Sequence, residues 1–179
     1  MSSQTVGRLA LIAMLGGATF VVAGVVQLAS PEPSDPFSRT SDYLVEALLV
    51  LSFLLTLAGF VALHLRQVGS YGGPRGRTGL RAAVIGQTAI LASAVASLAA
   101  GGLALGFLYV AGVFVLLVGI ALLSIATYRA AVLPHWSAYL VAALAAIVFG
   151  ELGVVLVGLV WIALGYALRA QRQGDPSVR

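Results

Sequence analysis

The side chains best suited to chemistry in this sequence are two acids near the start of a long apolar run. Asp42 and Glu46 are four residues apart, so in a helix they lie on one face. Glu46 falls about one turn inside the run, and an ionisable side chain within a membrane span is a candidate for function. Gln27 and Glu151, each at an edge of another apolar run, are expected at a similar depth.

These four residues predict a polar cluster that binds a cation, carries a proton or holds a small polar ligand. The alternative interpretation needs no ligand. Acids in the first turn of a helix complement its dipole, and their side chains reach the lipid headgroups.

The two histidines, His64 and His135, are the next candidates, at the end of one apolar run and the start of another. A metal site needs three or four ligands and groups that orient them, and the sequence places no acid beside either histidine. We therefore predict no metal site and no catalytic residue. No GxxxxGK[ST], HExxH or GxSxG motif occurs, so we expect no cofactor, and no module that reads nucleic acid is present.

Residues 64–81 form a polar, glycine-rich stretch between two apolar runs and contain no acid. Arginines in such a loop favour the cytoplasmic side of a membrane. They can also attract anionic lipid headgroups, each contributing about 1 kcal/mol near the surface. The candidates for that contact are Arg66, Arg75, Arg77 and Arg81.

Composition places the chain in a membrane. Of its 179 residues, 60% are hydrophobic and 9% are charged, whereas a soluble domain has about 25% charged residues. There is no cysteine, which excludes disulfides and thiol chemistry, and all ten basic residues are arginine. Arginine in place of lysine, with abundant alanine and glycine, is typical of a GC-rich bacterial genome, so we expect a multi-pass protein of the bacterial plasma membrane.

The hydropathy pattern predicts an all-α bundle of six membrane spans in a single domain. The first apolar run is longer than the 7–15 residues of a signal-peptide core, so we interpret it as an uncleaved span. A disordered cytoplasmic tail is expected at residues 171–179. The predicted spans are residues 9–29, 42–65, 79–100, 105–128, 136–149 and 152–170.

The last apolar stretch, residues 136–170, decides between six spans and five. One helix of that length would be roughly 52 Å long, against a hydrocarbon core of about 30 Å, and Gly150 and Gly153 offer a break around Glu151. With six spans and both termini inside, nine of the ten arginines are cytoplasmic and only Arg39 is outside. With five spans the division is six to four, so the positive-inside rule favours six.

Small residues repeat along two of the spans. Side chains this small let helix backbones approach closely in lipid, so we expect the third span at the centre of the bundle. A second copy of the chain or another membrane protein is a candidate partner of the bundle. The predicted packing residues are Ala89, Ser93, Ser97 and Gly101 at intervals of four, and Gly112 and Gly119 at an interval of seven.

Residues 128–136 contain an arginine-x-x-x-leucine-proline-x-tryptophan pattern, and residues 161–168 read WIALGYAL. Together with the glycine-rich loop after the second span, these segments resemble small six-span bacterial membrane proteins of unknown function. The resemblance implies a six-helix bundle and no assigned activity.

From the sequence we therefore expect an accessory, structural or sensory membrane component that is not an enzyme. The first alternative is a small carrier or channel-like protein with an outer polar vestibule around Glu46. The second is an intramembrane enzyme that modifies a lipid through one of the histidines.

Overall fold

The structure, a computed structural model, describes residues 3–30, 37–67, 74–131 and 133–170. All its regular elements are helices, which confirms the all-α class. They are α1 (Ser3–Ala29), α2 (Thr40–Gln67), α3 (Pro74–Ala100), α4 (Gly106–Ala130), α5 (Trp136–Ala143), the 3₁₀-helix η1 (Leu144–Phe149) and α6 (Gly150–Ala170). Within these ranges the side chains of Pro74, Arg75, Ile147, Phe149 and Glu151 are not described, and the predicted tail at 171–179 lies outside the described residues.

Five helices in this part of the chain are long and apolar enough to cross a membrane, and residues Trp136–Ala146 form a shorter apolar segment. Many large apolar side chains on the outer surface are exposed, among them Phe107 at 75% and Phe114 at 66%. Water would penalise that surface, whereas lipid tails satisfy it. The five long helices therefore indicate a multi-pass membrane protein.

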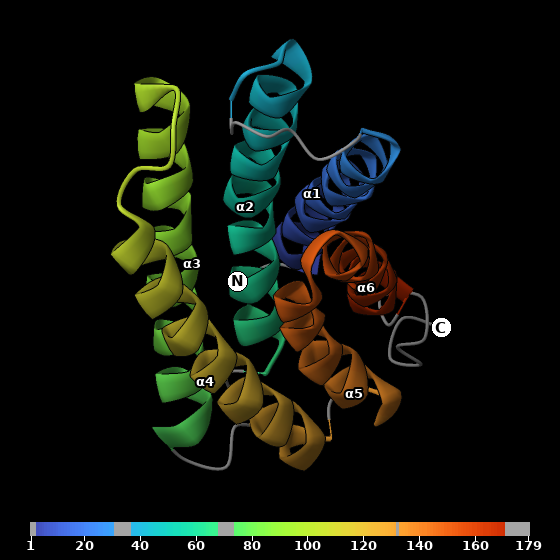
Figure 1. Cartoon of the computed structure of the whole chain (residues 1–179). Helices are drawn as coiled ribbons and strands as arrows, with labels where there is room; N and C mark the ends of the chain where they lie inside the picture. The colour runs from blue at the N-terminus through green and yellow to red at the C-terminus, as the bar shows by residue number, and fades with distance from the viewer. Residues whose placement is uncertain (1–2, 31–36, 68–73, 132, 171–179) are drawn as a thin grey trace.

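The helices form a ring in chain order. The largest interfaces join α3 to α4, α1 to α6 and α1 to α2, and smaller ones join α2 to α3, α4 to α5 and α5 to α6. Figure 1 shows α3 at one edge of this ring, with α4 crossing beside it. The predicted central position of the third span is thus wrong: its small residues serve one close neighbour, α4, and not several.

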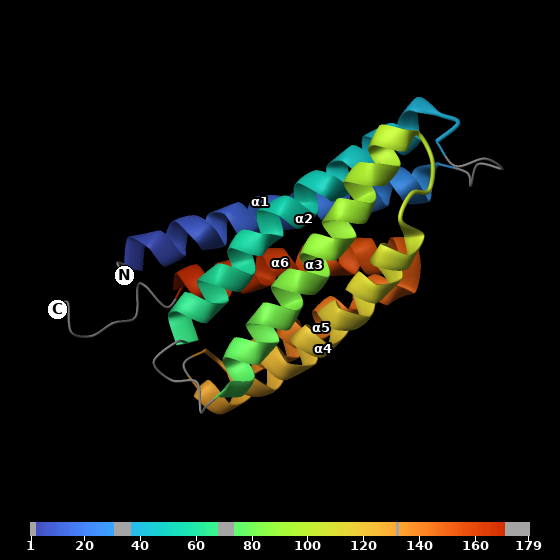
Figure 2. The ribbon, with the colours of Figure 1, turned by 90° about the vertical axis from the view of Figure 1, so that its left-hand side faces the viewer.

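The start of α1 and the end of α6 lie at the same end of the bundle (Figure 2), and one groove is lined by residues from both. The end of α1, the start of α2 and the α3–α4 connection lie at the opposite end. The end of α2 and the start of α3 also lie at the end that holds Ser3 and Ala170. We call it the arginine end, because Arg8, Arg66, Arg77 and Arg169 belong to these helix ends.

Residues 136–170 form a hairpin and not one long helix. The α5 helix passes directly into η1, and Gly150 then adopts φ 65° and ψ −139°, a conformation that favours glycine because a side chain would clash there. A 3₁₀-helix rises about 2.0 Å per residue against about 1.5 Å for an α-helix. The stretched geometry lets the 14 residues of α5 and η1 reach about 24 Å.

The α3 helix begins at Pro74, five residues before the predicted start at 79. Proline suits the first turn of a helix, since its missing N–H would have no partner there and its φ is already helical. The predicted start at residue 79 is therefore too late, and Arg77 and Arg81 extend from a helix instead of a loop.

Glycines let α3 and α4 touch along their backbones. A Cβ at Gly86 would lie against the backbone nitrogen of Leu116 and 2.6 Å from the carbonyl oxygen of Gly112. A Cβ at Gly119 would lie against the backbone nitrogen of Ala83. In lipid, van der Waals contact of this kind holds helices together, because the tails are as apolar as the side chains.

We predict that Gly119→Ala destabilises the protein by about 1–3 kcal/mol, as overpacking a tight contact does. The loss should appear even though alanine favours a helix interior by about 1 kcal/mol over glycine. Thermal unfolding in detergent, followed by circular dichroism, measures the change. The control is Gly102→Ala, because a Cβ there meets nothing within 4 Å; equal unfolding temperatures for both variants would contradict the contact.

Candidate functional site

A cavity of about 460 Å³ opens at the end of the bundle opposite the arginine end. Residues from α1, α2, α3, α4 and α6 line it, together with the α3–α4 turn. Its volume falls in the range of about 300–1,000 Å³ that is usual for small-molecule sites. The ring of helices therefore encloses a space that could hold one small ligand.

Glu46 and Gln27 bring the polar groups with unused capacity to this cavity. Both side chains line it, Glu46 from the second turn of α2 and Gln27 from the last turns of α1. The Gln27 side-chain oxygen is buried and has no hydrogen-bond partner among the described residues. A buried acceptor without a partner is costly, so a donor supplied by a ligand would stabilise it.

Tyr109, on the first turn of α4, lines the same cavity and lies close enough to Glu46 for the two to interact electrostatically. Sequence reasoning did not single out this residue. The available signal was a phenol within the first turn of an apolar helix, at the depth expected for Glu46.

Ser93 and Ser97 shape the wall of the cavity and do not offer free hydroxyls. Ser93 Oγ lies 3.1 Å from the Ala104 carbonyl oxygen and 3.2 Å from that of Leu105. Ser97 Oγ accepts the Ala104 N–H at 3.1 Å and lies 3.3 Å from its carbonyl oxygen. Both were predicted as interhelical packing residues; the structure places them under the α3–α4 turn, which they hold against α3.

The remaining predicted packing residues divide between the interface and the turn. Gly112 and Ala89 face each other, with 3.0 Å from a Cβ built on Gly112 to the Ala89 Cβ, and Gly119 contacts α3 as described above. Gly101 follows α3 with φ 62°. A residue without a side chain is favoured in this left-handed conformation, which ends the helix.

The rest of the cavity is apolar and its floor is aromatic. Leu49, Ile90 and Val154 line its sides. Below them the Phe20 and Phe53 rings pack edge to face at 5.0 Å, and those of Phe60 and Trp161 at 4.9 Å. Of these four residues Phe53 lines the cavity itself, and all four line a space of only about 10 Å³ beyond it, so this aromatic floor leaves little room below the cavity.

Asp42 has a structural role and does not line the cavity. Its Oδ2 accepts the backbone N–H of Arg39 at 3.0 Å, and its own N–H donates to the Arg39 carbonyl at 3.1 Å. This reciprocal pair caps the start of α2. Asp42 and Glu46 do lie one turn apart in α2, as predicted, but the cap holds the Asp42 carboxylate at the helix end.

The other predicted candidates lie apart from the cavity or outside the described part. The side chains of Glu151 and Arg75 are not described. Arg77 and Arg81 are exposed on the first turns of α3, and Arg66 is half-buried near the end of α2. His135 is exposed, with its ring 5.2 Å from that of Tyr128. No group of three acids or histidines able to hold a metal occurs within the described ranges.

Comparison with protein-family models, with curated proteins and with solved structures gave no match to this chain. The site must therefore be interpreted from its own geometry, and the resemblance to small six-span bacterial proteins stays a prediction.

We predict that Ser97→Ala loosens the α3–α4 turn more than Ser93→Ala does. Losing Ser97 Oγ removes the acceptor of the Ala104 N–H, and an unsatisfied buried N–H costs about 1–3 kcal/mol. Ser93 Oγ shares the Ala104 carbonyl with Ser97 Oγ, so its removal leaves one bond in place. Hydrogen exchange at residues 102–106 measures the effect; faster exchange in the Ser93 variant would contradict this assignment.

Proposed function

We propose that this protein is a sensory or accessory component of the bacterial plasma membrane that binds a small amphipathic cation, such as an organic amine, in the cavity at Glu46. One observation carries the proposal. The cavity is lined by the Glu46 carboxyl group and by the buried Gln27 amide oxygen, which has no hydrogen-bond partner among the described residues, while its other walls are largely apolar.

The chemistry of these groups selects the ligand class. An ionised carboxylate within a membrane needs a cation or several donors beside it. An ammonium group satisfies both needs, because it is charged and can donate one N–H to Glu46 and another to Gln27. The rings of Phe53 and Tyr109 add faces that attract cations. The aliphatic walls then suit a hydrocarbon body and disfavour a bare, hydrated metal ion.

The cavity also has a side that reaches toward the lipid. A second hollow of about 280 Å³, lined by α4, η1 and Gly150, shares Tyr109, Val110 and Gly150 with the cavity. A ligand that partitions into the bilayer could approach through this side. The aromatic floor favours binding over passage, so a sensory or accessory role fits the geometry better than a channel.

We predict that Glu46→Gln lowers the affinity for 4-phenylbutylammonium by at least roughly tenfold, since removing one partner of a desolvated charge pair costs several kcal/mol. Isothermal titration of the protein in detergent measures the affinity. Asp42→Asn is the matched control, one turn away on the same helix, and should keep the affinity because Asp42 caps α2 outside the cavity.

Two comparisons sharpen the test. The neutral alcohol of the same shape should bind weakly to the parent protein and to the Glu46→Gln variant. The trimethylammonium analogue should bind the parent less tightly than the primary amine does, because it has no N–H to donate to Gln27. Equal affinities of the parent and the Glu46→Gln variant would contradict the proposal. If the protein carries the amine into liposomes, the sensory or accessory role is wrong and the protein is a carrier.

We further propose that the chain crosses the membrane six times with both termini in the cytoplasm. The ring of alternating helices supports this, because the start of α1 and the end of α6 share one end of the bundle. The arginines gather at that same end, as the positive-inside rule requires of a cytoplasmic face. The cavity would then open at the outer face.

We predict that a membrane-impermeant maleimide labels the Ser38→Cys variant on intact bacterial cells, and that it labels the Thr78→Cys and Ala170→Cys variants only after permeabilisation. All three positions are exposed, and the parent chain has no cysteine to give a background. Labelling of the Ala170→Cys variant on intact cells would support five spans instead.

A further inference from the structure

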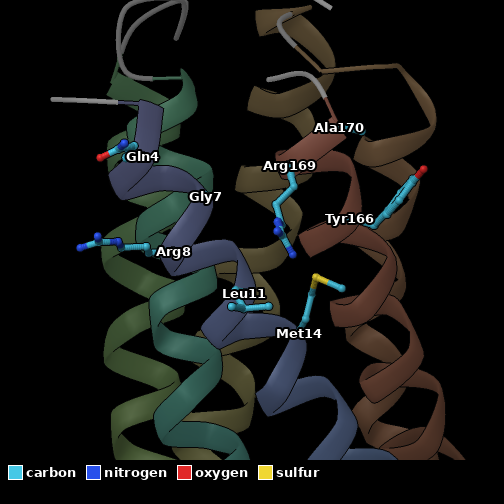
Figure 3. A pocket seen from close by; sticks show the side chains of 8 residues that line it. All are labelled: Gln4, Gly7, Arg8, Leu11, Met14, Tyr166, Arg169 and Ala170. Carbon is cyan, nitrogen blue, oxygen red and sulfur yellow. The ribbon is translucent and has the colours of Figure 1, made fainter. Parts of the chain in front are cut away.

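A separate hollow, at the arginine end, lies between the first turns of α1 and the last turns of α6. It measures about 490 Å³. One face of α1 lines it with Gln4, Gly7, Arg8 and Leu11, and one face of α6 lines it with Tyr166 and Arg169, as Figure 3 shows. We call this hollow the α1–α6 groove.

The base of the groove is fixed by a close helix contact. A Cβ at Gly165 would lie against the Met14 side chain and 2.9 Å from the carbonyl oxygen of Ala10. The two helices touch at this level, and beyond it toward their ends the groove opens. Met14 and Leu11 make the deep part of its lining apolar.

Arg169 brings a positive charge to the rim. Its side chain points into the space between the two helices, above Met14, whereas the Arg8 side chain extends from α1 to the side away from α6 (Figure 3). Neither guanidinium has a carboxylate partner among the residues that the structure describes. Tyr166 is 66% exposed on the opposite rim. A cationic rim above an apolar base is complementary to an amphiphile with an anionic head.

We infer that the α1–α6 groove binds one anionic phospholipid from the leaflet at the arginine end, with its phosphate on the Arg169 guanidinium. A guanidinium holds a phosphate through two parallel N–H donors. The acyl chains would then lie over Leu11 and continue along the lipid-facing surface. A free phosphate ion could use the guanidinium but not the apolar base, so the groove favours the lipid. The site is independent of the cavity at Glu46.

Native mass spectrometry of the detergent-solubilised protein with added phosphatidylglycerol tests this inference. We expect one phosphatidylglycerol to stay bound where phosphatidylcholine does not. Arg169→Gln should lower the retained fraction about fivefold, which corresponds to about 1 kcal/mol for one arginine. Arg8→Gln should lower it less, and Arg169→Lys should give an intermediate retained fraction, because the charge remains but the two parallel N–H donors of the guanidinium are lost.

The matched controls are Arg77→Gln and Arg81→Gln, which remove exposed arginines of α3 at the same end. They should leave retention unchanged. Equal losses in all four glutamine variants would show a diffuse charge effect and overturn the site. Displacement of the lipid by millimolar inorganic phosphate would assign the groove to the free ion. Circular dichroism of each variant verifies that it is folded, so a loss of lipid reports on the groove.

Discussion

Helices in lipid gain little from hiding apolar side chains, so this bundle depends on where backbones can touch. The touching points are glycines: Gly17 and Gly158 bring α1 to α6, with 2.6 Å from a Cβ built on Gly17 to the Gly158 carbonyl oxygen. Gly86, Gly112 and Gly119 do the same for α3 and α4. These two tight pairs are joined by α2, whose interface with α3 is smaller. The α1–α6 pair and the α3–α4 pair do not pack tightly against each other along their whole length, and the cavity lies between them.

The position of that space follows from polar contacts as well as glycines. Nearer the middle of the bundle the Gln87 side chain on α3 donates to the Phe53 carbonyl at 2.6 Å and to Thr56 Oγ1 at 2.9 Å, which ties α3 to α2. Toward the far end no such bond joins these helices among the described residues, and the cavity opens there between Glu46 and Ser97. The buried amide of Gln87 thus marks the level above which α2 and α3 separate. Glu46 lines the cavity on the far side of this level.

Sequence reasoning predicted the parts of this structure that depend on hydropathy and spacing. The all-α class and the break near Gly150 follow from those signals. Gln27 and Glu46, which were expected at a similar depth, both line the cavity. It could not assign Asp42, because a carboxylate at the start of a helix fits a cap and a site equally well. It also misjudged α3, since a stripe of small residues indicates close approach without saying how many neighbours use it. Tyr109 was missed because its partner is distant in the chain.

The short segment made of α5 and η1 borders one side of the cavity. A full-length fifth helix would pack against α4 along its whole length and close the ring. Instead η1 unwinds into 3₁₀ geometry and stops at Gly150, where positive φ turns the chain at once into α6. Beside that turn lies the hollow that shares Tyr109 and Gly150 with the cavity. Six residues of 3₁₀-helix therefore extend a short segment along the bundle and bring the turn at Gly150 to the side of the cavity.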